Sequence, residues 1–365
     1  MNYWKSGIVF GIIFSICPFT GFYDSPSLFI SDGEELNPSR VYDSSGSAIY
    51  IDDTSEYYTW ELFSLLSPLS TGKGTVEDPY IIQGSFLGSG TSDAIVIMNS
   101  KAHFMIKDSV IFSSGGSGIV FRNVQNGNII DSSIVNSDYG IFLDSCSNVT
   151  IANNEVLSNK QSGINIFRSS NIIVKSNRVA NNQMAGISLF KSDSTTVYSN
   201  TVSSNNLLGV VSGMGSGYII KNNHIFNHSN GIYLYKSTLS SVIGNEITNV
   251  TEFGILIQYN SNFNTIINNT LLNNYFLIGL GEDCGNNNIF NNSANQILVI
   301  DGTYGPPPFS EEEFEELNRL YFSSKESSTL PGYDIGLILS IISFAFLFLF
   351  IKFRLQNTQR VNKKG

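Results

Sequence analysis

A glycine followed by a branched aliphatic residue returns every 22 or 23 residues through the middle of this chain. A unit of this length is too short to bury a core of its own, so it must stack on copies of itself. The residues after each glycine alternate between aliphatic and variable side chains, which is the period of a strand with one buried face. The repeat therefore predicts an all-β solenoid. Its clear copies begin at Gly118, Gly140, Gly163, Gly186, Gly209, Gly231 and Gly254.

A second marker follows 14 residues after six of these glycines, and it is usually asparagine. Asparagine tolerates the left-handed backbone that a tight corner requires, and its amide can both donate to and accept from the same amide one coil along. We therefore expect these residues to form stacked corners rather than a functional site. They are Ser132, Asn154, Asn177, Asn200, Asn223 and Asn245.

These repeats resemble the right-handed parallel β-helix repeats of NosD-type and CASH (carbohydrate-binding and sugar hydrolase) domain proteins. Residues 72–82, GKGTVEDPYII, are similar to a segment that often leads into such helices. The resemblance covers about residues 45–302 and implies a right-handed parallel β-helix. The clear copies together with weaker ones at residues 94–97, 277–280 and 296–300 predict about nine or ten coils. It specifies the fold more than the function, because this fold hosts lyases, hydrolases, binding proteins and adhesins.

Both ends of the chain predict export to a cell surface. Lys5 precedes an apolar run, as in a secretory signal, and the uncharged residues 335–351 precede a basic tail, as in a membrane span. These charges place the β-helix outside the cell, and a buried core helix is the alternative for 335–351. The predicted parts are 1–22 signal peptide or signal anchor, 23–92 N-terminal cap, 93–302 β-helix, 303–333 linker, 334–352 transmembrane helix and 353–365 basic cytoplasmic tail.

Each end of the solenoid has a candidate covering segment. Residues 48–51 and 57–62 are predicted strands of the N-terminal cap, with Trp60 as its anchor. In the linker, Ser310 and the following glutamates begin a predicted helix over 311–321 that caps the other end; a flexible acidic stalk is the alternative. Its apolar face consists of Phe314, Leu317, Leu320 and Tyr321. Pro331-Gly332-Tyr333 resembles the Pro-Gly-Phe type of archaeal surface-anchoring tail, with tyrosine in place of phenylalanine.

Composition excludes some functions. Charged residues make up 14% of the chain and its net charge is −10, so we expect no nucleic-acid partner. Cys146 and Cys284 lie six coils apart, which is too far for a disulfide.

The repeat register places an aromatic row on the outward face of the strands that follow the glycines. Such a face suits stacking against sugar rings, with polar groups alongside for the hydroxyls. The alternatives are that stacked residues only stabilise the solenoid, or that another segment or a partner covers them. The predicted ligand-binding residues are Phe142, Phe167, Phe190, Tyr233, Tyr235, Arg168 and Lys191.

No catalytic residue, cofactor or metal site is predicted. Asp144 is expected to pair with Arg122 one coil back, Glu155 with Arg178 repeats this arrangement, and Asp138 and Asp193 have no evident partner. His224 and His228 are expected to be solvated corner residues, since their spacing suits a metal only on an α-helix.

The sequence therefore favours a membrane-anchored extracellular β-helix that binds carbohydrate or another cell-surface ligand. A polysaccharide lyase or glycoside hydrolase, and a structural or adhesive rod, are the alternatives. Five Asn-x-Ser/Thr motifs are candidate glycosylation sites on an exported protein. Their acceptors are Asn148, Asn227, Asn249, Asn268 and Asn291.

Overall fold

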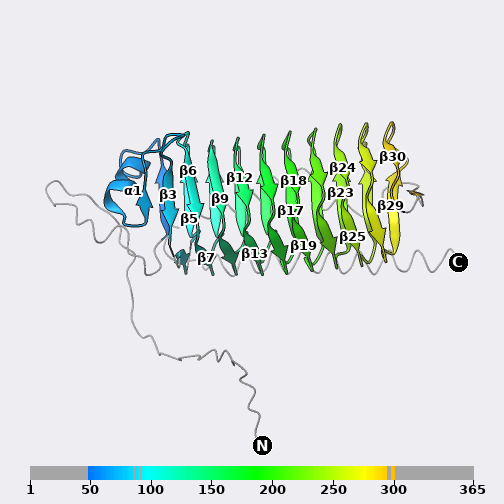
Figure 1. Ribbon diagram of the computed structural model, residues 1–365, viewed down its shortest axis with the longest axis horizontal. Coiled ribbons are helices and arrows are strands. Elements are labelled where there is room, and N and C mark those ends of the chain that lie inside the picture. Colours follow the sequence, from blue (N-terminus) through cyan, green and yellow to red (C-terminus); the bar gives the residue numbers. More distant parts are fainter. Residues whose placement is uncertain (1–47, 85–86, 91, 294–296, 301–365) are drawn as a thin grey trace, which may run out of the picture. The chain divides into compact units, whose positions relative to one another are not determined.

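The computed structural model describes residues 48–84, 87–90, 92–293 and 297–300. Within them the chain winds into a solenoid, and each full coil gives one strand to each of three sheets (Figure 1). The sheets have 11, 11 and 9 strands, in agreement with the predicted nine or ten coils. Every pairing between coils is parallel, so the sheets run along the stack.

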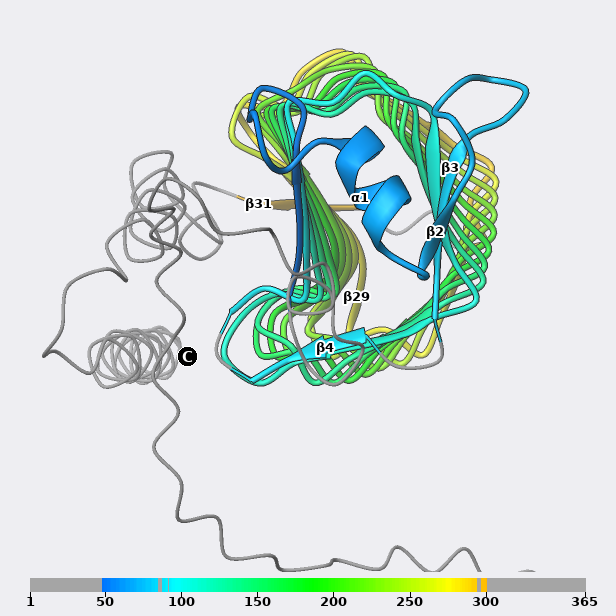
Figure 2. The same cartoon turned by 90° about the vertical axis from the view of Figure 1, so that its left-hand side faces the viewer.

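The three sheets form three walls around a lumen (Figure 2). Sheet A contains β1 (Ile49–Asp52), β5 (Ile95–Met98), β8 (Ile119–Arg122), β11 (Ile141–Asp144), β14 (Ile164–Phe167), β17 (Ala185–Phe190), β20 (Leu208–Gly213), β23 (Asn230–Tyr235), β26 (Phe253–Gln258), β29 (Phe276–Gly281) and β31 (Ile297–Ile300). Sheet B contains β2 (Ser70–Thr71), β3 (Tyr80–Gln83), β6 (Phe104–Lys107), β9 (Gly127–Ile130), β12 (Thr150–Ala152), β15 (Ile173–Lys175), β18 (Thr196–Tyr198), β21 (Ile219–Lys221), β24 (Ser241–Ile243), β27 (Thr265–Ile267) and β30 (Asn288–Phe290). Sheet C contains β4 (Leu87–Ser89), β7 (Val110–Ser113), β10 (Ser133–Val135), β13 (Glu155–Leu157), β16 (Arg178–Ala180), β19 (Thr201–Ser203), β22 (His224–Phe226), β25 (Glu246–Thr248) and β28 (Thr270–Leu272).

The register of the strands follows the sequence repeat. Ile141 lies opposite Ile164, and Ile164 opposite Ile187, so the aliphatic residue after each glycine stacks on its copy in the next coil. Every second side chain along a strand points into the lumen, where these residues join the aliphatic side chains of sheets B and C in one core. Burial of this continuous core holds the coils together, since no single coil has a core of its own.

The predicted asparagine stack is present and runs along the corner between sheets B and C. The side chain of Asn177 accepts from the Asn154 side chain at 3.0 Å and donates to the Asn200 side chain at 3.0 Å. Its Nδ2 also donates to the carbonyl of Ile151 inside the lumen. Each ladder asparagine therefore satisfies buried polar groups of its neighbours as well as its own.

The left-handed residue of this corner is one position earlier than predicted. Ser176 and Ser199 have φ of 55°, whereas the ladder asparagines that follow them do not have positive φ. The two tasks are therefore divided between adjacent residues, one making the turn and the next hydrogen-bonding inward.

The repeat glycines are required for space. A β-carbon on Gly163 would lie 2.6 Å from Cγ1 of Val179 in β16 and 2.7 Å from Nδ2 of Asn182 in the corner after that strand. None of the repeat glycines needs a positive φ. The glycine therefore lets sheet A approach the corner that follows sheet C.

Helix α1 (Trp60–Leu66) lies across the lumen at its N-terminal end (Figure 2). Thr59 caps the helix by accepting from the backbone of Leu62. Trp60 stacks on Tyr80 with ring centroids 4.9 Å apart, and its Nε1 donates to Ser100 at 3.0 Å. The prediction of a strand over residues 57–62 was therefore wrong, because the Thr59 cap and the inward Trp60 and Phe63 favour a helix.

Residues 72–79 join β2 to β3 in the antiparallel hairpin that precedes the parallel coils. Gly72 and Gly74 have φ of 95° and 78°, which other residues rarely adopt. The predicted signal segment, linker helix, membrane span and basic tail lie outside the described residues. Within the described ranges, no helix is long and apolar enough to cross a membrane.

Candidate functional site

The predicted aromatic row lies on the outer side of sheet A. In β11, Ile141 and Leu143 point into the lumen, so Phe142 and Asp144 point to the other side. The same alternation places the remaining aromatic members of the row in β14, β17 and β23. With neighbours from adjacent coils they form a second apolar cluster, separate from the core of the lumen.

These aromatic side chains are buried, and the expectation of an exposed aromatic platform was wrong. Their exposed fractions are 0% for Phe142, 2% for Phe167, 0% for Phe190, 4% for Tyr233 and 3% for Tyr235. Burial also raises the pKa of the Tyr233 hydroxyl well above its ordinary value. A sugar ring cannot stack on rings that have no accessible face.

The two basic residues of the predicted site lie at one margin of this face. Arg168 directly follows Phe167, its guanidinium carbon is 4.7 Å from the centroid of that ring, and it forms two hydrogen bonds to Asp144 at 2.7 and 2.9 Å. Lys191 directly follows Phe190. Both have positive φ, because they occupy the turn that leaves sheet A.

Three of the predicted charge relations can be compared with the structure. Glu155 pairs with Arg178 at 3.6 Å, as expected. Asp144 lies in register with Arg122, but its ion pair is with Arg168 of the following coil, because the turn places that guanidinium over the carboxylate. Asp138, for which no partner was expected, pairs with Lys160 at 3.0 Å.

Sheet B presents a different surface, on which lysine, tyrosine and lysine are stacked in consecutive coils. Lys175 lies in register with Tyr198, and Tyr198 with Lys221. All three side chains are half-buried, and Nζ of Lys221 lies 5.5 Å from the centroid of the tyrosine ring. Among the described residues neither lysine takes part in an ion pair. We call these three residues the sheet B triad.

Beside the triad, a second column of side chains on sheet B alternates between apolar and polar residues. Ile173, Thr196 and Ile219 lie in register on the same three strands, two positions before the triad residues. Both isoleucines are 38% exposed. The repeat glycines mark only the strands of sheet A, so they gave no signal for this surface. The strand before each ladder asparagine does carry one, since each triad residue lies two positions before such an asparagine.

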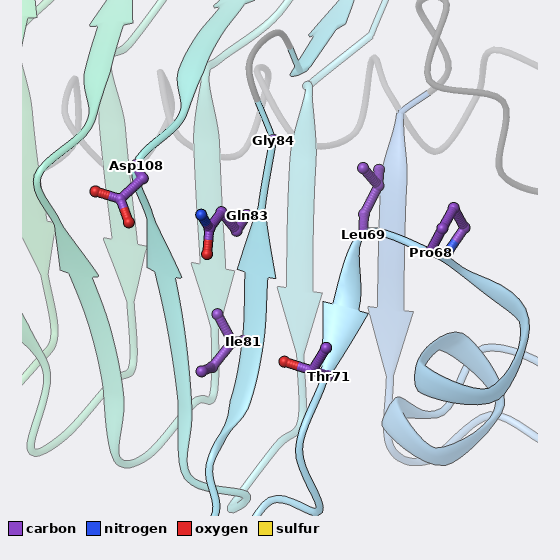
Figure 3. Close-up of a pocket in the computed structure, with 7 residues that line it drawn as sticks. All are labelled: Pro68, Leu69, Thr71, Ile81, Gln83, Gly84 and Asp108. Carbon is purple, nitrogen blue, oxygen red and sulfur yellow. The ribbon is translucent and has the colours of Figure 1, made fainter.

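A shallow pocket of about 330 Å³ lies beside the first strands of sheet B (Figure 3). Asp108 is its only carboxylate, and it lies 3.6 Å from the ammonium group of Lys107. A pair of carboxylates suited to glycoside hydrolysis is not present in this pocket. The lining residues are Pro68, Leu69, Thr71, Ile81, Gln83, Gly84 and Asp108.

His228 is buried, so the expectation of a solvated corner residue was wrong for it. It occupies the next place in a second ladder, after Asn159, Asn182 and Asn205. Burial lowers the pKa of its imidazole, although its contacts with the carbonyls of Asn205 and Val202 act in the opposite sense. His224 is exposed beside Phe226, and no group of three metal-binding side chains occurs in the part of the chain that the structure describes.

Cys146 and Cys284 are both buried free thiols. Burial raises the pKa of each to about 12, which leaves them as poor nucleophiles at neutral pH. The five candidate glycosylation acceptors, in contrast, are all exposed at turns and all have positive φ.

A family model described as the right-handed β-helix region matches residues 69–217 and 183–306. Together these matches include more than half of the chain. The chain belongs to the right-handed β-helix family. The handedness expected from the sequence is therefore confirmed.

Solved structures similar to this β-helix have low sequence identity. The Dettilon tailspike protein is 16% identical with a TM-score of 0.42, over 60% of this chain and 61% of that one. The periplasmic alginate epimerase AlgG is 14% identical with a TM-score of 0.40, over 68% and 81%. The A-module of a mannuronan C-5 epimerase from Azotobacter vinelandii is 13% identical with a TM-score of 0.37, over 61% and 81%. No curated protein matches the chain in sequence.

The outer faces of this β-helix thus contain two stacked arrangements that differ in exposure, an aromatic row on sheet A and the sheet B triad with its single tyrosine. The row on sheet A is buried, whereas the sheet B triad is accessible and carries two ammonium groups. Of these two surfaces, only the sheet B triad is exposed enough to contact a ligand directly.

Proposed function

We propose that this chain is a membrane-anchored extracellular β-helix that binds an acidic polysaccharide through the sheet B triad. The supporting observation is the half-exposed Tyr198 ring between two lysines without ion pairs among the described residues. Neighbouring strands are about 4.8 Å apart, so the two ammonium groups extend from strands separated by about 10 Å.

Each part of this surface matches a part of such a ligand. The Tyr198 ring provides an apolar face for the C–H groups of a sugar, and the Thr196 hydroxyl can donate to or accept from sugar hydroxyls. The contact of Lys221 with the ring is worth only about 0.5–1 kcal/mol when exposed, so a carboxylate can draw the ammonium group away from it. The charged groups select a polyanion over a neutral glycan.

The apolar residues 335–351 and the basic residues after them support the proposed anchor. Three expectations stay predictions: the NosD-type and CASH subtype, the tail of the Pro-Gly-Phe type, and the closure of the N-terminal end by residues 23–92.

Treating intact cells with protease tests whether the β-helix lies outside the cell. Loss of an epitope placed in the Thr238–Ser240 turn, with retention of one at the C-terminus, is expected, and the reverse pattern contradicts the proposal.

Binding can be tested with the detergent-solubilised full chain and polygalacturonate, with neutral dextran as the comparison ligand. We expect Tyr198→Ala to weaken binding of polygalacturonate roughly tenfold, as expected for loss of an aromatic contact worth about 1.4 kcal/mol. The double variant Lys175→Gln, Lys221→Gln should weaken polygalacturonate binding further and remove most of the dependence of the affinity on salt concentration.

Phe226→Ala is the matched control, because Phe226 is also half-buried on an outer strand face but belongs to sheet C. It should leave affinity unchanged. Equal loss in Tyr198→Ala and Phe226→Ala, or equal affinity for dextran and polygalacturonate, would overturn the proposed site.

A further inference from the structure

The outer faces of the three sheets are not equally accessible. On sheets B and C, outward apolar side chains such as Ile173 and Phe112 are 38% and 41% exposed. On sheet A, one column of outward side chains lies in register from Val120 in β8 to Leu256 in β26, and each of these side chains is at most 4% exposed. A face of seven strands, roughly 29 Å along the stack, is therefore shielded from water.

No described helix or strand lies outside sheet A to provide this shielding (Figure 2). The side chain of Asn165 on this face is 1% exposed, and its Oδ1 has no hydrogen-bond donor among the described residues. A buried acceptor of this kind is rare in a complete interface. The face is therefore shaped for a covering segment.

The described chain ends at this face. Ile300, the last residue of β31, is 9% exposed and belongs to the same outer apolar cluster as Phe190 and Tyr235. Residues that follow it leave from the cluster itself. The 13 residues 301–313 can reach about 43 Å when extended, whereas β17 lies five strand spacings, or about 24 Å, from β31.

Charge distinguishes the segments that could cover the face. At the margin of sheet A, Arg168, Lys191 and Lys236 occupy equivalent turn positions and form a basic column that Met214 interrupts between the two lysines. Arg168 also pairs with Asp144. Residues 311–316 are Glu-Glu-Glu-Phe-Glu-Glu, and the apolar side chains of the predicted helix follow at helical spacing. The segment offers an apolar stripe for the cluster and carboxylates for the basic column.

We propose that residues 309–321 fold back along the outer face of sheet A and dock on it through Phe314, Leu317, Leu320 and Tyr321. This position differs from the end cap expected from the sequence alone. A helix of 11 residues is about 16 Å long, so it covers about half of the face, and the flanking residues of the 303–333 linker are long enough for the rest.

Disulfide trapping in the full chain tests this docking. Ser188→Cys places a thiol in the middle of the face, and a second cysteine is scanned through the linker, in a Cys17→Ser background. We expect intramolecular crosslinks from Phe314→Cys and Leu317→Cys. Glu312→Cys and Glu315→Cys, on the opposite side of the predicted helix, are the matched controls and should crosslink poorly.

The single variant Ser188→Cys gives a second measurement. Its thiol should react with a maleimide about tenfold more slowly than that of Thr196→Cys on sheet B, and Phe314→Asp with Leu317→Asp should abolish the difference. Crosslinked dimers would identify a second copy as the occupant. Equal labelling at Ser188 and Thr196, or slow labelling without any linker crosslink, would also overturn the proposal.

Discussion

In this solenoid, the contacts between a residue and its copies in adjacent coils determine which residue type fits at each position. Asn177 bonds to Asn154 and Asn200, so a substitution at one ladder position also removes partners from its neighbours. His228 departs from this pattern, since a titratable ring follows Asn159, Asn182 and Asn205 in the second ladder. The neutral ring fits this position, since Nδ1 can accept from the backbone N–H of Asn205 while Nε2–H donates to the carbonyl of Val202.

His228 therefore makes stability depend on pH. Its pKa is lowered in the folded state, so below about pH 6.5 the unfolded chain binds the proton more readily and the free energy of unfolding falls as pH decreases. We expect His228→Asn, which restores an amide to the ladder, to reduce this fall between pH 7.5 and 5.5 in urea denaturation. His224→Asn is the control, and a His228→Asn curve parallel to the wild type would contradict the assignment.

At the scale of elements, the tight approach of sheet A to the preceding corner depends on the repeat glycines. A side chain at Gly163 would meet Val179 and Asn182 in a closely packed interior, where added methyl groups typically destabilise by about 1–3 kcal/mol. Gly163→Ala should therefore lower the free energy of unfolding by that amount. Gly90→Ala is the control because its β-carbon would meet no atom within 4 Å, and equal effects of the two would show that packing is not the cause.

Elements that repeat could be predicted from the sequence, and elements that occur once could not. Seven copies of Gly-Ile or Gly-Val set the register of sheet A, and the period-2 pattern correctly gave the outward direction of Phe167 and Phe190. Helix α1 has no copies, so no repeat marks it; only the three-residue spacing of Trp60 and Phe63, which places both on one face of a helix, indicates it. The accessibility of the aromatic row could not be predicted, because burial depends on contacts distant in sequence.

The Asp144 pairing shows a similar limit. Strand register is determined by the repeat, and it correctly placed Arg122 opposite Asp144. The partner in the structure, Arg168, comes from a turn whose left-handed residue aims its side chain back along the stack. Turn geometry of this kind is not evident from strand periodicity.

For the molecule as a whole, each coil contacts mainly its neighbours, so stability is close to a sum of local terms. The ends of such a stack open more readily than its middle unless another element covers them. At the N-terminal end, α1 inserts Trp60 against Tyr80 and Phe104.

Removal of that contact should therefore act locally. Trp60→Ala is expected to destabilise the first coils by about 3–5 kcal/mol, since it creates a cavity and leaves Ser100 without its donor. Amide hydrogen exchange should accelerate in β1 and β3 and stay unchanged in β14 and β17. Uniform acceleration along all coils would contradict this prediction.

The parallel register has a mechanical consequence. Backbone hydrogen bonds between coils point along the stack, so tension applied at its two ends loads successive pairs of coils in series rather than shearing many bonds at once. A coil that detaches releases about 23 residues, or roughly 75–80 Å of extended chain, while the coils beyond it stay folded. A solenoid held at a surface and pulled by a bound ligand would thus lengthen one coil at a time.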